Sequence, residues 1–282
     1  MTKIALLFSL AGCFSVAAFA QHKGQIAAAQ LPATGAHYMP EYTFDKTVDE
    51  QAWKVTKPGL HVSFGTTDKL FFRTEVPVRQ ASLLWEATGW RGERLNTQIL
   101  VWATDTLQQV RFTVSDLVSA NGHKISSEQA KLNMVRYVLS NYPYAAKDAV
   151  CGDSPYKDGF LMPDRFEAFE RFDVPGKTAR PVWLSLDVPR DAAPGAYTGS
   201  ITVHTTTSTA TLQVKVTVQS QVWPAPHDWE YRLDLWQNPW AVASYNLLQL
   251  WSEEHKVLLK QHMRLYADAG GKDITTYGVH SP

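Results

Sequence analysis

Three segments with alternating apolar and polar side chains constrain the fold of this chain more than any other feature. They are Val182–Val188, Tyr197–Val203 and Leu212–Val218, with Val, Leu and Ile on one side and Ser, Thr, Lys and Gln on the other. Such alternation is typical of β-strands with one buried and one solvated face. Ala193-Pro194-Gly195 predicts a turn before the second strand, and Thr205–Thr209 predicts a hairpin turn before the third. We expect the three strands to form one wall of a β-sandwich.

The sequence between residues 70 and 114 extends this pattern towards the N-terminus. Four short runs rich in β-branched and aromatic residues follow one another there, with Gly89 and Gly92 as turn signals. Their spacing favours an antiparallel sandwich. Ala130–Leu139 fits a helix or a strand, and the pattern does not choose between them. The four runs are Phe71–Arg73, Ala81–Trp85, Gln98–Trp102 and Val110–Val114.

Composition excludes several classes of protein. Apolar residues make up 45% of the 282-residue chain, which is too many for a disordered protein. The 27 basic and 27 acidic side chains cancel, so no basic field is present to bind nucleic acid. The 10 Trp, 11 Tyr and 12 Phe exceed the needs of ordinary packing, and such enrichment accompanies ligands with apolar faces, sugars among them.

The first twenty residues are typical of a signal peptide. Lys3 precedes an apolar stretch, and Ala18-Phe19-Ala20 is a small-x-small cleavage pattern before Gln21. The prediction is an exported protein, periplasmic or extracellular, whose mature chain starts at Gln21. The alternative is that Leu10–Cys13 is a lipobox and Cys13 is acylated, which anchors the protein to a membrane. No other segment is long and apolar enough to span a bilayer.

The two cysteines indicate neither a disulfide nor a reactive thiol. If Cys13 leaves with the signal peptide, Cys151 is alone and cannot form an intramolecular disulfide. Cys151-Gly152-Asp153-Ser154-Pro155 is typical of a loop without a neighbouring histidine, so we interpret Cys151 as a structural residue rather than a nucleophile. The sequence predicts neither a metal site nor a cofactor.

The pattern changes after Val222. Trp223-Pro224-Ala225-Pro226-His227 predicts a stiff linker, residues 223–229. A strand is expected at Tyr231–Trp236, then a helix capped by Ser252 and ended by Gly270-Gly271, then a strand at Ile274–Val279. This order predicts a parallel βαβ unit with a right-handed crossover.

This unit is short for the fold it starts. Residues 230–282 amount to about a fifth of a closed (β/α)8 barrel. Either the unit packs on the sandwich as an appendage, or the chain is the front of a longer protein. We therefore predict a mainly β chain with a signal peptide at 1–20, an antiparallel sandwich at 21–222, a linker at 223–229 and a truncated barrel start at 230–282.

Several motifs in both parts resemble one enzyme family. The motifs of the C-terminal part resemble the opening of the catalytic domain of glycoside hydrolase family 123, and those upstream are similar to the N-terminal sandwich of that family. The C-terminal motifs are Leu233–Ala243, Leu250–His255 and Ala267–Thr275. The upstream motifs are Gly92-Glu93-Arg94 with Gln98, Ser115-Asp116-Leu117, Pro181-Val182-Trp183 and Pro194–Gly199.

The resemblance implies a retaining β-N-acetylgalactosaminidase in which the 2-acetamido group of the substrate is the nucleophile. An adjacent Asp-Glu pair on a later barrel strand would assist it, one carboxylate staying charged while the other donates a proton. That pair would lie beyond Pro282, so no catalytic residue is assigned in this chain. Asp49-Glu50 is interpreted as a solvated turn, and Glu253-Glu254 as the acidic first turn of a helix.

A rim of the substrate site is expected at the end of the first barrel strand. If Leu233 and Leu235 face the helices, Asp234 and Trp236 point inward. Residues just beyond the strand lie where barrel active sites are built. The predicted substrate-binding residues are Asp234, Trp236, Gln237, Asn238 and Trp240. The alternative is that Asp234 is an internal hydrogen-bond partner and the tryptophans are core residues. His280 is a weaker candidate.

The predicted ligand is an N-acetylgalactosamine-containing glycan, and the oligomeric state is not predicted. Two other functions stay open. The chain would otherwise be a non-catalytic carbohydrate-binding or architectural sandwich, or an exported or lipid-tethered interaction protein unrelated to sugars.

Overall fold

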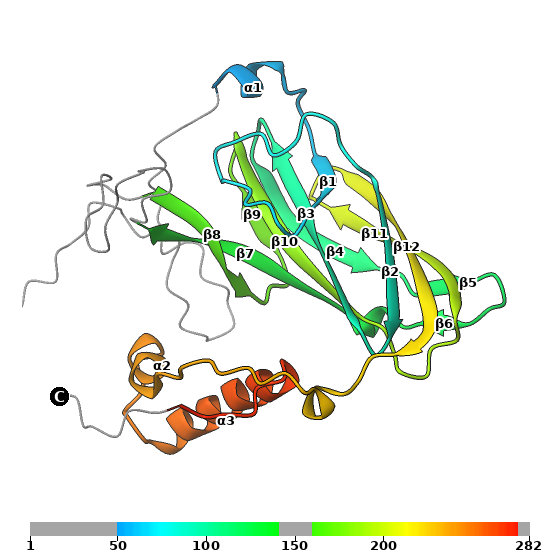
Figure 1. Cartoon of the computed structure of the whole chain (residues 1–282). Coiled ribbons are helices and arrows are strands. Elements are labelled where there is room, and N and C mark those ends of the chain that lie inside the picture. Colours follow the sequence, from blue (N-terminus) through cyan, green and yellow to red (C-terminus); the bar gives the residue numbers. More distant parts are fainter. Residues whose placement is uncertain (1–49, 141–159, 276–282) are drawn as a thin grey trace, which may run out of the picture.

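The computed structural model describes residues 50–140 and 160–275, and these residues form a mostly β protein of two facing sheets with a helical C-terminal segment (Figure 1). The predicted signal peptide, which includes Cys13, lies outside the described ranges, and so do Gln21, Asp49, the segment Cys151–Pro155 and residues 276–282, which include Val279 and His280. No helix in the described ranges has the length and apolar character needed to cross a membrane.

The first sheet has five strands in the order β1-β3-β10-β7-β8, all antiparallel to their neighbours. β3 and β10 form its centre, with Val182 opposite Ile99. The strands are β1 (His61–Gly65), β3 (Arg94–Ala103), β7 (Ala130–Ser140), β8 (Phe160–Glu167) and β10 (Thr178–Asp187).

The second sheet follows the order β2-β12-β11-β4-β9, with β5 beside β11 and β6 beside β5. Its pairs are antiparallel except that of β2 with β12, which is parallel. The strands are β2 (Leu84–Arg91), β4 (Leu107–Val114), β5 (Leu117–Ser119), β6 (Lys124–Ile125), β9 (Phe172–Val174), β11 (Gly195–His204) and β12 (Thr209–Val222). The antiparallel sandwich predicted from the sequence is therefore confirmed.

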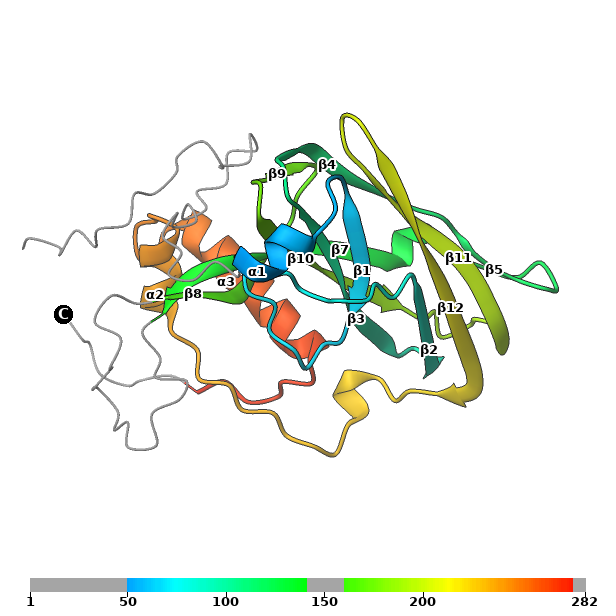
Figure 2. The same ribbon diagram turned by 90° about the horizontal axis from the view of Figure 1, so that it is seen from above.

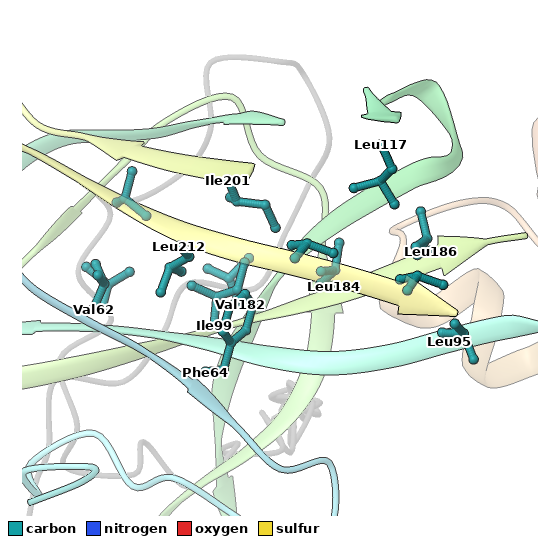
Figure 3. Packing of buried hydrophobic residues seen from close by; sticks show 14 of the residues in the cluster. Val62, Phe64, Leu95, Ile99, Leu117, Val182, Leu184, Leu186, Ile201 and Leu212 are labelled. Carbon is teal, nitrogen blue, oxygen red and sulfur yellow. The ribbon is translucent and has the colours of Figure 1, made fainter. Parts of the chain in front are cut away.

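The main core lies between the sheets. Ile99 and Val182 of the first sheet and Ile201 and Leu212 of the second are at most 1% exposed. Figure 3 shows these side chains converging from both layers. Full burial of each such side chain contributes about 1.5–3 kcal/mol relative to exposure, so this layer is the main source of stability.

The expectation that the three alternating strands form one wall is wrong. β11 and β12 pair as the predicted hairpin, with His204 opposite Thr209, but β10 belongs to the opposite sheet. The chain crosses between the layers in the segment 188–194, so the apolar faces of β10 and β11 meet across the core instead of lying side by side. Alternation identifies the buried face of each strand, and it carries no information on which sheet the strand joins.

A third layer covers part of the first sheet. The helix α1 (Glu50–Val55) places Trp53 beside Phe71, Leu100 and Trp102, all at most 4% exposed. The prediction of a strand at Phe71–Arg73 is wrong, because this run is an irregular segment whose apolar side chains pack on the outer face of β3. β3 is consequently buried on both faces along most of its length.

The other predictions for the sandwich differ in accuracy. Gln98–Trp102 and Val110–Val114 lie within β3 and β4, and the undecided run Ala130–Leu139 is a strand, β7. Of the run Ala81–Trp85, only Leu84 and Trp85 belong to a strand, because β2 begins at Leu84. β2 continues to Arg91, so Gly89 lies inside a strand rather than in a turn. Gly92 does make the turn after β2, with φ of +83°, and a Cβ there would lie 2.9 Å from Arg190.

The C-terminal segment holds two helices and two short parallel contacts. The helices are α2 (Pro239–Tyr245) and α3 (Glu253–Asp268), after a 3-10 turn, η3 (Pro226–Asp228). The predicted strand Tyr231–Trp236 is reduced to two isolated bridges, Leu233 with Gly271 and Trp236 with Thr275. Both bridges are parallel, as the predicted βαβ order requires. Figures 1 and 2 together show α2 and α3 on the side of the sandwich away from α1.

A row of three tryptophans joins this segment to the sandwich. The Trp223 ring lies 5.4 Å from Trp90 of β2 and 6.3 Å from Trp229. The Trp223 backbone N–H donates to the carbonyl of Arg91 at 2.7 Å, and Arg190 Nη1 donates to the Trp223 carbonyl at 2.6 Å. The predicted linker is thus packed against the end of the sandwich.

Candidate rim of a substrate site

The two parallel bridges bring the ends of two chain segments to one edge. Trp236 lies opposite Thr275, and Asp234 Oδ1 accepts a hydrogen bond from Thr275 Oγ1 at 2.7 Å. Gln237 Oε1 accepts from the Thr275 backbone N–H at 3.2 Å, and Gln237 Nε2 donates to the Leu235 carbonyl. Asp234 and Gln237, both predicted from the sequence, are therefore brought together by one residue of the second segment.

Tyr266 of α3 fixes the first of these segments from behind. Its hydroxyl donates to the Leu233 carbonyl at 2.5 Å and accepts from the Leu235 backbone N–H at 3.2 Å. Arg232 forms a two-pronged ion pair with Asp273, at 3.1 and 2.7 Å. The two segments are thus held in register by side chains where only two backbone bridges form.

Trp236 is strongly exposed, with 72% of its surface accessible. The expected inward and outward faces are only partly realised, because Leu233 is half-buried while Leu235 is 53% exposed. An accessible indole next to a fixed carboxylate is a chemical arrangement that suits a pyranose, whose C–H face stacks on aromatic rings and whose hydroxyls donate to carboxylates.

Asn238 and Trp240 have structural contacts as well. Asn238 is the N-cap of α2, and its Oδ1 accepts from the Ala241 backbone N–H at 3.0 Å. The Trp240 ring packs edge-on against Trp251, with centroids 6.0 Å apart. The N-cap position explains Asn238 by ordinary helix chemistry, because side-chain oxygens at that position satisfy backbone donors.

His255 is a residue of this region that the sequence reasoning missed. It is fully buried, its Nδ1 accepts from the Trp251 backbone N–H at 3.0 Å, and its Nε2–H donates to the Pro239 carbonyl at 3.0 Å. This hydrogen-bond pattern assigns the neutral Nε2–H tautomer. His255 thus ties the start of α3 to the start of α2 and orients the chain after the rim. The sequence signal that could have identified His255 is its position at the end of the family motif Leu250–His255.

Glu253 and Glu254 behave as predicted for a helix start. Glu253 pairs with Lys256 at 2.7 Å, and Ser252 caps the helix by accepting from the His255 backbone N–H at 3.2 Å. Hydrogen bonds from its own backbone N–H and from Ser252 lower the pKa of Glu254 below its ordinary value. Both carboxylates are therefore used at the helix N-terminus.

The chemical capacity of the rim follows from these contacts. The exposed Trp236 ring is available for stacking, and the Asp234 carboxylate is held by the Thr275 hydroxyl. Within residues 50–140 and 160–275, no group of three or more His, Cys, Asp or Glu is arranged to hold a metal ion.

Comparisons with known proteins match both parts of the chain. A family model described as the glycoside hydrolase 123 N-terminal domain matches residues 64–205, and one described as the glycoside hydrolase 123 catalytic domain matches residues 236–282. The comparison with curated protein sequences gave no match.

Among solved structures, the chain is similar to a family 123 glycoside hydrolase from Clostridium perfringens, studied for glycolipid glycan hydrolysis. The identity is 24% and the TM-score 0.67, over 76% of this chain and 37% of that one. The chain thus spans little more than a third of that relative. The CooA pilin subunit from enterotoxigenic Escherichia coli is 11% identical over 57% of this chain and 98% of its own, with a TM-score of 0.28 that supports no argument.

The N-terminal model alone covers half of the chain, the catalytic model begins at the first rim tryptophan, and the solved relative shares the fold. This chain belongs to glycoside hydrolase family 123.

Proposed function

We propose that the chain is the N-terminal part of an exported glycosidase that hydrolyses N-acetylgalactosaminides with retention, using the 2-acetamido group of the substrate as nucleophile. The observation that carries the proposal is the match of the family 123 catalytic domain over residues 236–282, which include the rim residues Trp236 to Trp240 and Thr275, the partner of Asp234. The substrate class itself comes from the family resemblance.

The proposed roles of the rim residues follow their contacts. Trp236 offers its accessible ring to a pyranose face. Asp234 accepts hydrogen bonds from sugar hydroxyls, and its bond to Thr275 keeps the carboxylate in place. Gln237 fixes the edge, while Asn238 and Trp240 shape the turn into α2.

The catalytic step requires two further carboxylates. One orients the acetamido group and stays charged beside the developing oxazolinium, and the other protonates the leaving oxygen, so their pKa values must differ. We propose that this Asp-Glu pair belongs to a later barrel strand encoded downstream of Pro282.

The experiment compares the 282-residue chain with a gene-extended protein on an aryl N-acetyl-β-galactosaminide. We expect activity only in the extended protein, and no hydrolysis of the matching β-galactoside, which lacks the acetamido group. Activity in neither protein would overturn the proposal and favour a non-catalytic sandwich. Equal activity on both substrates would overturn the substrate-assisted mechanism.

Variants of the extended protein test the rim. Trp236→Ala and Asp234→Asn should each reduce kcat/KM at least about tenfold, corresponding to about 1.4 kcal/mol of lost transition-state binding. Tyr231→Ala and Asp228→Asn are matched controls, because both residues are exposed and lie before the rim. Rim variants with the kinetics of their controls would remove these residues from the site.

Export is proposed from the N-terminal sequence alone. Mass spectrometry of the secreted protein should give a mature N-terminus at Gln21. A mature N-terminus at an acylated Cys13 would show instead that the protein is anchored to a membrane and is not released.

A further inference from the structure

A cavity lies at the other end of the molecule from the rim. It has a volume of about 550 Å³ and opens between α1, the start of β1 and the segment 76–79. Figure 1 shows α1 at the end of the sandwich opposite α2 and α3, so this cavity is separate from the proposed substrate site. Its volume falls in the range of small-molecule sites, about 300–1,000 Å³.

The floor of the cavity is preorganised by aromatic packing. Trp102 of β3 is 4% exposed, and the His61 ring stacks on it with centroids 5.4 Å apart and planes at 17°. His61 Nε2–H donates to the Lys57 carbonyl at 2.7 Å, which fixes the ring and the chain after α1. A ligand therefore meets a fixed floor rather than one that must be ordered on binding.

The charged side chains that line the cavity are both positive. Lys57 and Arg79 both line it, and its lining among the described residues contains no Asp or Glu. The chain as a whole has zero formal charge, so two cations on one concavity whose described lining holds no acidic residue form a local positive field. Such a field recognises an anionic group, and arginine in particular binds carboxylates and sulfate-type oxyanions through paired N–H groups.

The remaining lining combines apolar and neutral polar side chains. Val76 and Val78 form one wall and pack against the outer core cluster, while Gln51 and Thr56 present an amide and a hydroxyl. A ligand that satisfies this lining carries an anionic group, several hydroxyls and one apolar face. An acidic pyranose has these three features.

We propose that this cavity binds an acidic sugar through its carboxylate or sulfate group, as an accessory glycan site on the sandwich. The anion requirement comes from Lys57 and Arg79, whereas the sugar class rests on the proposed glycosidase function. Lys57 and Arg79 hold the anionic group, the valine wall receives the C–H face of the ring, and Gln51 bonds to hydroxyls.

The test is titration of the purified chain by calorimetry with five probes: a glucuronic acid disaccharide, a sialylated trisaccharide, a sulfated N-acetylgalactosamine, neutral N-acetylgalactosamine and inorganic sulfate. At least one acidic sugar should bind at least about tenfold tighter than the neutral sugar, and its affinity should fall as salt rises. The carboxylate and sulfate arms separate the two sources of the anion. Equal binding of neutral and acidic sugars, no binding by any acidic sugar, or inorganic sulfate binding as tightly as the best sugar would overturn the proposal.

Matched double variants place the binding at the cavity. Lys57→Gln with Arg79→Gln should weaken the best acidic sugar at least about tenfold. Arg111→Gln with Lys215→Gln removes the same charge from exposed positions of the second sheet and should leave its affinity within about twofold. All four side chains are exposed, so these variants should fold. An equal loss in both double variants would mean that only the overall field attracts the sugar, and would overturn the site.

Hydrolysis distinguishes this proposal from the proposed function. In the gene-extended protein, Lys57→Gln with Arg79→Gln should leave hydrolysis of a neutral aryl N-acetyl-β-galactosaminide unchanged while acidic-sugar binding is lost. Loss of that hydrolysis in the folded variant would contradict an accessory role. If the extended protein is inactive but still binds acidic sugars through this cavity, the proposed function is overturned and the accessory-site proposal stands.

Discussion

The sandwich and the C-terminal segment differ in how completely they bury their apolar side chains. The sandwich strands bury theirs from both sides, and Val101, Val182 and Leu212 have no exposed surface. In the segment after Val222, large apolar side chains are exposed before and on the first bridged stretch, between α2 and α3, on α3 and beside the second bridged residue. They are Trp223, Tyr231, Leu235, Trp236, Leu247, Trp251, Val257, Leu265 and Ile274.

This difference shows what a single βαβ unit lacks. A sandwich has two sheets that cover each other, whereas a parallel strand needs neighbours on both sides and helices on both faces. The C-terminal segment holds its register with Tyr266 and the Arg232–Asp273 pair instead of a continuous ladder. Four predictions test how different the two regions are.

The largest expected effect is in amide hydrogen exchange. Backbone amides of β3, β10 and β12 should exchange at least about 100-fold more slowly than those of α3, because the segment opens with a free energy lower by about 3 kcal/mol or more. Mass spectrometry of peptides from the intact chain measures this ratio. Equal protection would mean that the C-terminal segment is a stable appendage of the sandwich.

The second comparison uses one substitution in each region. Leu212→Ala should lower the free energy of unfolding of the sandwich by about 2–5 kcal/mol, since it leaves a cavity in a closed core. Leu265→Ala, at a side chain 68% exposed, should change it by less than about 0.5 kcal/mol. Urea unfolding followed by tryptophan fluorescence supplies both values, and similar losses would show that α3 is part of the same cooperative core.

The third comparison concerns helix caps. Ser252→Ala removes the acceptor for the His255 N–H and should destabilise α3 by about 1 kcal/mol, seen as faster exchange of its first-turn amides. Ser126→Ala removes the equivalent cap of the 3-10 turn Ser127–Gln129 in the sandwich. We expect a smaller change there, because the surrounding strands hold that turn. An unchanged α3 in Ser252→Ala would show that the His255 contacts alone fix its start.

The smallest expected effect is a pH-dependent change in stability. It compares the Arg94–Asp187 ion pair of the sandwich with the Arg232–Asp273 ion pair of the C-terminal segment. Partial burial raises the pKa of Asp187, but the Arg94 hydrogen bonds at 2.5 and 3.0 Å and the nearby Lys131 outweigh it and hold the pKa below its usual value. A lowered folded-state pKa gives stability that is complete above the unfolded pKa of about 4 and disappears as pH falls through the folded value.

Asp187→Asn should therefore cost about 0.5–1 kcal/mol near pH 7 and progressively less below about pH 4. Asp273→Asn, which breaks the matching pair in the C-terminal segment, should leave global unfolding unchanged at both pH values. Thermal melts across pH 3–7 measure the two differences. If the stability difference between the wild-type chain and Asp187→Asn stays constant with pH, the ionised carboxylate is not its source.

The sequence predicted the local features well and the non-local ones poorly. Alternation identified β11, β12 and the buried side of β10, because side-chain period depends only on neighbouring residues. It could not place β10 in the opposite sheet, since that depends on pairing with the distant β3. Phe71–Arg73 looked like a strand because burial on an outer face requires the same apolar residues as burial in a sheet.

The candidate site shows the same division. Asp234 and Gln237 were found from strand alternation and a family motif, and both converge on Thr275. The roles of Tyr266 and His255 depend on contacts between segments, which the sequence does not display. The capping role of Asn238 was visible in principle, because Asn followed by Pro is a common helix start.

The tryptophan row has a practical consequence for protein engineering. A sandwich excised at Val222 would lose the ring that covers Trp90 and the carbonyl that receives Arg190. Trp229 lies between both regions, since it contacts Trp223 on one side and Gly270 at the end of α3 on the other. Grafts that carry the sandwich onto another enzyme should therefore keep the chain through Trp229 and fuse after it.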